Sequence, residues 1–220
     1  LGVKPAADIA NVVERWLQMA EELSDTLVMA CNTLSVRHRC LPVTRVATSG
    51  PKQVVSMVDC FAALVKAEQE RLTGRKVLII GTRYTAGQKL YPDMLRAAVP
   101  NVLTRTAAAT ELERAVARFE SWNDEDESVL NHDLRRSLRE TDFAVLACTC
   151  FPLVMTRLES HFPDVTFLDP SSYCTGLIRK HSAMQNKRLR IKTTGDVVSA
   201  AQAVDFAESL LGTGDIECFT

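Results

Sequence analysis

Apolar residues along the chain alternate between short continuous runs and longer stretches with helical spacing. Residues 6–22 repeat apolar positions every three or four residues, and an apolar run of strand length follows at residues 26–30. Further strand-like runs cover residues 43–47, 76–80, 102–106, 142–147, 165–168 and 189–193. Further helix-like stretches cover residues 52–70, 86–98, 110–121, 126–140, 152–161, 171–183 and 197–211. Strands that alternate with helices predict an α/β protein with parallel sheets flanked by helices.

Two of the apolar runs end in the same way. Residues 27–30 lead into Cys31-Asn32-Thr33, and residues 145–147 lead into Cys148-Thr149. Open α/β sheets bind ligands at the carboxyl ends of their strands, so the two cysteines are expected in one cleft. Two thiols suit the inversion of a stereocentre, because one removes the α-proton and the other delivers a proton to the opposite face. The positive end of a helix that follows each strand would stabilise the thiolate.

A buried core position is the alternative interpretation for each cysteine, since cysteine is among the most buried residue types. The duplicated context, rather than the residue type, favours a site. Asn32, Thr33 and Thr149 would add hydrogen-bonding groups for a carboxylate and an amine.

Composition excludes several classes of function. The 220 residues carry 26 basic and 27 acidic side chains, a balance that leaves no electrostatic footprint for nucleic acid or an anionic membrane. No apolar stretch approaches the roughly 18 residues of a membrane-spanning helix. The seven cysteines are odd in number and irregularly spaced, which favours free thiols in a reducing compartment and predicts a cytoplasmic protein.

Two further patterns have some features of cofactor sites. Gly81-Thr82 follows a strand, but the chain has neither G-x-G-x-x-G nor a Walker lysine, which argues against a nucleotide site. Cys148-x-Cys150 lacks the C-x-x-C spacing of common zinc sites, and Cys150 reads equally well as a small apolar residue beside the cleft. We therefore expect no cofactor and no metal.

Taken in order along the chain, these motifs resemble those of the cofactor-independent glutamate racemases of the aspartate/glutamate racemase superfamily. Ala30-Cys31-Asn32-Thr33 is similar to the first cysteine motif, and residues 148–153 are similar to the second, Cys-Thr-His-Tyr-Pro-Leu. Residues 81–85 with Tyr91 resemble Gly-Thr-x-x-Thr and its later tyrosine. Shorter matches lie at residues 1–4, 168–170 and 193–196.

The resemblance implies two facing α/β domains, the first made of residues 1–50 and 168–220 and the second of residues 51–167. It implies a cofactor-independent isomerase that supplies a D-amino acid for peptidoglycan biosynthesis, with Cys31 and Cys148 as the acid/base pair. The implied substrate is a small acidic amino acid, most closely glutamate, and racemases of this family often form homodimers. The substrate-binding residues that it implies are Gly2, Asn32, Thr33, Thr82, Thr85 and Thr149.

Two departures from the family pattern keep alternatives open. Family members begin with a strand ending in Asp-Ser-Gly, and we expect that strand to be missing before Leu1. The histidine that supports the second cysteine is replaced by Cys150, and the acidic partner of that histidine falls on Glu113. A degenerate member that binds an acidic small molecule or a partner protein without turnover is the first alternative, and a racemase of aspartate or another amino acid is the second.

Overall fold

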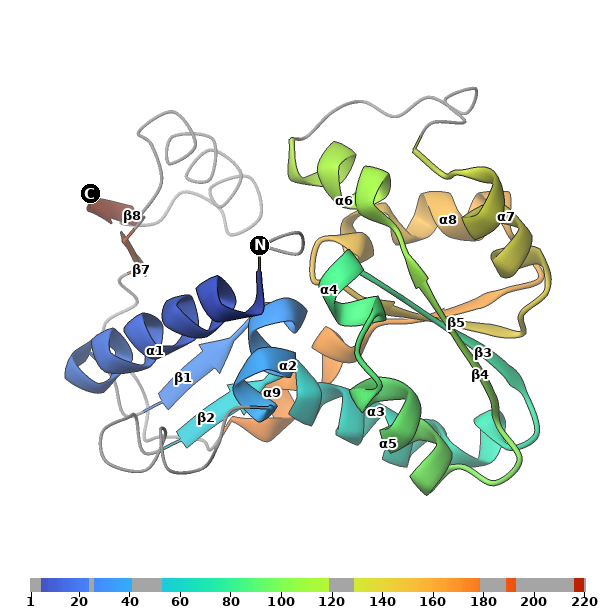
Figure 1. Cartoon of the computed structure of the whole chain (residues 1–220), viewed down its shortest axis with the longest axis horizontal. Coiled ribbons are helices and arrows are strands. Elements are labelled where there is room, and N and C mark those ends of the chain that lie inside the picture. Colours follow the sequence, from blue (N-terminus) through green and yellow to red (C-terminus); the bar gives the residue numbers. More distant parts are fainter. Residues whose placement is uncertain are drawn as a thin grey trace. The chain divides into compact units, whose positions relative to one another are not determined.

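The computed structural model describes residues 5–23, 26–40, 53–118, 129–178, 189–192 and 216–219 (Figure 1). The chain divides into two units, Leu1–Ile178 and Arg179–Thr220. In the second unit, β7 (Leu189–Lys192) pairs in parallel with β8 (Ile216–Phe219). The strand predicted at residues 189–193 is thus present, whereas the helix predicted at 197–211 lies outside the described residues. The predicted domain boundaries stay a prediction.

A two-stranded parallel sheet opens the first unit. It pairs β1 (Thr26–Met29) with β2 (Gln53–Ser56). The preceding helix α1 (Ala6–Leu23) buries Val13 and Leu17 in one apolar cluster with Met29. Helix α2 (Asn32–Arg39) follows β1 directly. The strand predicted at residues 43–47 lies outside the described residues.

The helix predicted at residues 52–70 begins later than expected. Residues 53–56 form β2, and helix α3 (Met57–Leu72) starts after Ser56. Two β-branched residues, Val54 and Val55, suit the strand. A capping box then fixes the helix start, because Ser56 Oγ accepts from the Asp59 backbone N–H while the Asp59 carboxylate accepts from the Ser56 N–H.

The larger sheet of the first unit has four parallel strands in the order β4-β3-β5-β6. They are β4 (Leu103–Ala108), β3 (Lys76–Gly81), β5 (Phe143–Ala147) and β6 (Thr166–Leu168). Because side chains alternate along a strand, Val77 and Ile79 pack with α3 and with α5 (Leu90–Ala98). Leu78 and Ile80 pack on the other face with α6 (Thr110–Ala117), α7 (His132–Arg139) and α8 (Met155–His161), as Figure 1 shows. Each such buried side chain contributes about 1.5–3 kcal/mol.

Side-chain caps or prolines mark the starts of some of the remaining helices. The helix predicted at residues 86–98 is split into α4 (Arg83–Ala86) and α5, and α7 starts later than the predicted residue 126, with Asn131 as its cap. The helices predicted at residues 152 and 171 begin as proline-containing 3₁₀ turns, η2 (Phe151–Val154) and η3 (Pro170–Tyr173), and η3 leads into α9 (Cys174–Leu177). The described part of the chain contains no helix long and apolar enough to span a membrane.

Candidate active site

The structure brings the two cysteine motifs together. Cys31 caps α2 just after β1, and Cys148 directly follows β5, so each lies at the carboxyl end of a parallel strand. Thr149 Oγ1 donates a hydrogen bond to the Ala30 carbonyl oxygen over 3.1 Å, although the two residues are 119 positions apart in sequence. The neighbour of one cysteine therefore contacts the neighbour of the other.

Three threonine hydroxyls meet beside these turns. Thr33 Oγ1 lies 3.0 Å from Thr82 Oγ1 and 3.5 Å from Thr85 Oγ1, and Thr82 Oγ1 donates to Thr85 Oγ1 over 3.1 Å. All three side chains are buried. A Cβ atom on Gly81 would lie 3.1 Å from Thr85 Cβ and 3.2 Å from the Ala147 carbonyl oxygen. Glycine at position 81 therefore lets the threonine cluster approach the end of β5 closely.

Asn32 is held by a tyrosine from a distant helix. The Tyr91 hydroxyl donates to Asn32 Oδ1 over 2.6 Å, and both side chains are buried. The Phe61 ring packs against Tyr91 with centroids 4.4 Å apart. Burial raises the pKa of Tyr91, so its hydroxyl remains a donor, and the Asn32 amide nitrogen is left free to donate elsewhere. Tyr91 belongs to one of the motifs that resemble the family, but the sequence did not assign it a role. Its position in an amphipathic helix could have indicated one, because a buried tyrosine hydroxyl needs a hydrogen-bond partner.

Burial dominates the electrostatics of Cys31. Desolvation raises the pKa of the Cys31 thiol, while the backbone N–H groups of Leu34 and Thr33 lower it by a smaller amount. Neither N–H meets the geometry of a capping hydrogen bond to the side chain. The expected stabilisation of the thiolate by the helix start is thus present, but burial outweighs it and the pKa of Cys31 is raised.

A thiol pair occupies the second cysteine motif. Cys148 Sγ and Cys150 Sγ lie 3.1 Å apart. This contact, together with burial, raises the pKa of Cys148, and the same contact lowers the pKa of Cys150; either sulfur can be the donor. The Glu113 carboxylate on α6 raises the pKa of both thiols and also that of Cys31, though in each case it is a minor cause. Cys150 and Glu113 therefore share one environment with the two predicted catalytic cysteines.

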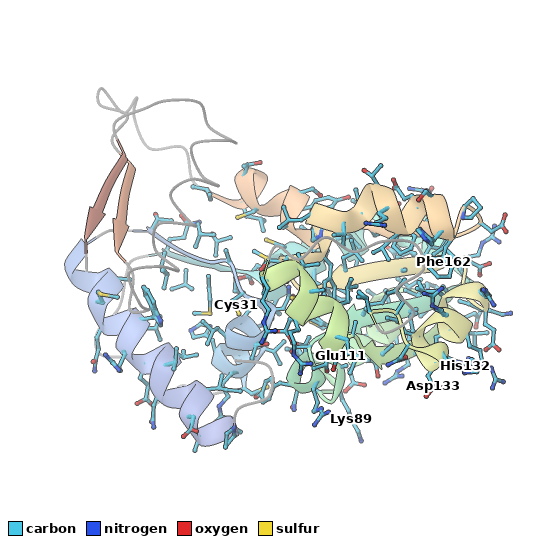
Figure 2. All side chains as sticks on the ribbon, turned by 90° about the horizontal axis from the view of Figure 1, so that it is seen from above. Cys31, Lys89, Glu111, His132, Asp133 and Phe162 are labelled. Carbon is cyan, nitrogen blue, oxygen red and sulfur yellow. The ribbon has the colours of Figure 1, made fainter. Side chains whose placement is uncertain are left out.

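Other chemistry-bearing features lie away from these turns. His132 Nδ1 lies 3.5 Å from Asp133 Oδ1 on the exposed surface, far from Cys31 in Figure 2. A cavity of about 380 Å³ opens at the amino ends of β3 and β4, the sheet edge opposite the cysteine motifs. Among the described residues, no group of three or more His, Cys, Asp or Glu side chains is placed to hold a metal. Gly2, predicted to bind substrate, lies outside the described residues.

Residues 2–175 match the family model of the Asp/Glu/Hydantoin racemases, and the chain belongs to that family. Among its relatives, the glutamate racemase of Latilactobacillus sakei subsp. sakei (strain 23K) is 28% identical over 211 residues, which cover 90% of this chain and 73% of the relative. The glutamate racemase of Histophilus somni (strain 2336) is 25% identical over 218 residues, covering 91% and 79%. The predicted superfamily and the assignment to an amino-acid racemase are thereby confirmed.

Solved structures share the fold. Glutamate racemase isoform RacE1 from Bacillus anthracis superposes with a TM-score of 0.69 at 19% identity, covering 100% of this chain and 83% of that chain. Escherichia coli glutamate racemase, solved with L-glutamate and the activator UDP-MurNAc-ala, gives a TM-score of 0.67 at 20% identity and covers 100% and 84%. At these identities the likeness concerns the fold alone, and it confirms the predicted α/β racemase architecture.

Proposed function

We propose that this protein racemises glutamate without a cofactor, with Cys31 and Cys148 as the two acid/base groups. The observation that carries the proposal is the hydrogen bond from Thr149 to Ala30, which holds the two cysteine turns side by side. The sequence relatives named glutamate racemases support this substrate. The Francisella tularensis glutamate racemase, which shares the fold, was solved with D-glutamate.

In the proposed reaction, one cysteine acts as thiolate and takes the α-proton of the amino acid. The other, as thiol, gives its proton to the opposite face of the same carbon. The buried hydroxyls of Thr33, Thr82 and Thr85 now hydrogen-bond to one another, and a substrate carboxylate would take the place of some of these bonds, because a carboxylate only accepts. Asn32 and Thr149 would bind the remaining polar groups of the substrate.

The two cysteines would reach their thiolate forms by different routes. Burial opposes the ionisation of the Cys31 thiol, and the backbone N–H groups at the start of α2 favour it. Because the pKa of Cys150 is lowered, Cys150 would ionise first. Cys148 would then become a thiolate by passing its proton to the Cys150 thiolate. Glu113 would influence both routes through its charge.

Incubation of the protein with L-glutamate in heavy water tests this function. We expect D-glutamate that carries deuterium at the α-carbon, without pyridoxal phosphate or added metal. Because burial raises the pKa of Cys31, the rate should increase as the pH is raised from about 7 towards 9. Binding of L-glutamate, measured by calorimetry, without any α-exchange would instead favour the degenerate binding protein. Exchange of L-aspartate alone would assign the activity to that substrate.

A cytoplasmic location is part of the proposal. All cysteines whose side chains the structure describes are free thiols, as a reducing compartment would keep them. The expected homodimer stays a prediction.

Tyr91→Phe is expected to weaken substrate binding more than turnover. The change removes the hydroxyl that orients Asn32 and leaves the buried Asn32 Oδ1 without that donor, a loss of about 1–3 kcal/mol. We expect the KM for glutamate to rise roughly tenfold, with a smaller change in kcat. Steady-state kinetics in both directions measure the split between the two constants.

A double-mutant cycle separates positioning from general stability. If Tyr91 acts through the Asn32 amide, Tyr91→Phe should have little further effect in an Asn32→Ala background. Tyr173→Phe is the matched control, since Tyr173 packs against the same apolar cluster. Equal KM increases for the two tyrosine variants would contradict a positioning role for Tyr91.

A further inference from the structure

Cys148 and Cys150 form a close thiol contact at the candidate active site. Their sulfurs, 3.1 Å apart, are separated by about 1 Å more than the length of a disulfide bond. The two residues flank Thr149 in the turn between β5 and η2, so no movement of a distant element is needed to bring them together. Cys148 is buried, whereas Cys150 is partly exposed.

We propose that Cys148 and Cys150 form a modification site for hydroperoxides, which oxidise the two thiols to a reversible intramolecular disulfide. The disulfide can form whether or not the protein is a racemase. The loss of Cys148 as an acid/base group, which the disulfide would cause, rests on the proposed function.

The geometry assigns a different role to each sulfur. A thiolate, not a thiol, attacks a peroxide, and the contact with the Cys148 sulfur lowers the pKa of Cys150. Cys150 is also the more exposed of the two, so it is the attacking group. Cys148 stands within reach behind it and is the resolving group, a placement typical of redox-sensitive cysteines.

The oxidation balances with a hydroperoxide as the only oxidant. The Cys150 thiolate attacks one peroxide oxygen, the O–O bond breaks, and Cys150 becomes a sulfenic acid while the departing hydroxide takes a proton from solvent. Cys148 then loses its proton and attacks the sulfenic sulfur. The S–O bond breaks, the second hydroxide leaves with that proton as water, and the S–S bond forms. With hydrogen peroxide, two thiols are oxidised by two electrons and the peroxide is reduced to two waters.

The disulfide is expected to be reversible because the two cysteines are only two positions apart in sequence. A bridge between residues two positions apart closes a very small loop, so it restricts the unfolded chain little and gains little stability from that restriction. Such a disulfide should be easily reduced by a dithiol such as dithiothreitol.

Cys60 also has a neighbouring thiol, yet Cys60 itself is not placed to attack a peroxide. Cys60 interacts with Cys174, but burial and that contact raise the pKa of Cys60 to about 12. The Cys60 side chain is also fully buried. The Cys60 thiol is therefore protonated at neutral pH and shielded from peroxide, and we expect it to react far more slowly than Cys150.

Peptide mass spectrometry tests the proposal directly. Cleavage after Arg139 and Arg157 releases residues 140–157, which contain Cys148 and Cys150 and no other cysteine. After brief treatment of the reduced protein with hydrogen peroxide, this peptide should be lighter by two hydrogen atoms and should resist alkylation. Dithiothreitol should restore both alkylatable thiols, and racemase activity should fall and recover in step.

Two cysteine variants show whether Cys150 is one of the bridged residues. Cys150→Ser should retain one alkylatable thiol in the peptide, whereas Cys40→Ser, which alters an exposed cysteine elsewhere, should form the bridge like the unaltered protein. A bridge from Cys148 to Cys31, or irreversible sulfinic acid at Cys150, would overturn the proposal. A bridge in a protein without racemase activity would uphold the modification site and reject only the proposed function.

Discussion

Replacing Cys31 by serine is expected to lower racemisation by at least about 10³-fold in both directions. A serine hydroxyl is far too weak an acid to supply the thiolate, and it is also a poor donor to a carbanion. Acid/base groups of this kind typically contribute roughly 10²- to 10⁴-fold to the rate. The measurement is the appearance of the opposite enantiomer on a chiral column, with L- and D-glutamate tested separately.

Single cysteine variants also assign each thiol to one face of the substrate. Cys31→Ser should still exchange the α-hydrogen of one enantiomer with heavy water through Cys148, and Cys148→Ser should exchange the other through Cys31. Cys40→Ser is the control, because this exposed cysteine lies outside the candidate site. If Cys31→Ser retained full racemisation, or if both variants exchanged the same enantiomer, the two-thiol mechanism would be wrong.

Restoring a histidine at position 150 is expected to raise kcat by roughly 10²-fold. A cysteine is a weak hydrogen-bond donor and acceptor, whereas an imidazole can donate from one ring nitrogen and accept at the other. In the present chain the contact with Cys150 raises the pKa of Cys148 and so disfavours its base form. The gain should therefore be largest in the direction in which Cys148 removes the α-proton, measured by initial rates from each enantiomer.

Two controls test whether a gain in kcat in Cys150→His comes from the imidazole. Cys150→Ser also removes the second thiol but introduces no imidazole, so it should not match the gain of Cys150→His. Because the overall equilibrium constant of a racemisation is fixed near one, the ratio of kcat/KM values for the two enantiomers must stay unchanged. An unaltered kcat in Cys150→His, with substrate binding intact, would show that position 150 does not limit the reaction.

The two central strands of the larger sheet, β3 and β5, were predictable from sequence because their side chains are buried on both faces. Residues 76–80 and 142–147 are almost continuously apolar, and they correspond to β3 and β5. The boundary between β2 and α3 was not predicted, since Val54 and Val55 also fit the apolar spacing of a helix. The Ser-x-x-Asp capping signal at Ser56 would have located the helix start.

The candidate site was also partly predictable. Open α/β sheets bind ligands at the carboxyl ends of their strands, so the repeated Ala-Cys ending was the signal for a shared site. The sequence did not show that β1 and β5 belong to different sheets. The Tyr91 to Asn32 bond was not predictable, because it joins α5 to α2 across 59 residues. The contact of Cys148 with Cys150 depends on how the turn after β5 folds back, and the raised pKa of Cys31 depends on burial, neither of which follows from local sequence.

The hydrogen bond from Thr149 to Ala30 also bears on the order in which contacts form as the chain is synthesised and folds. It closes a loop of 119 residues, whereas the contact of Thr33 with Thr82 closes one of 49. Loop closure costs more entropy as loops lengthen, and contacts between distant residues form slowly. During synthesis, the threonine hydroxyls of α2 and α4 can meet well before the second cysteine has been added to the chain. A growing chain would thus assemble the proposed carboxylate-binding hydroxyls before it contained the second of the two proposed acid/base cysteines.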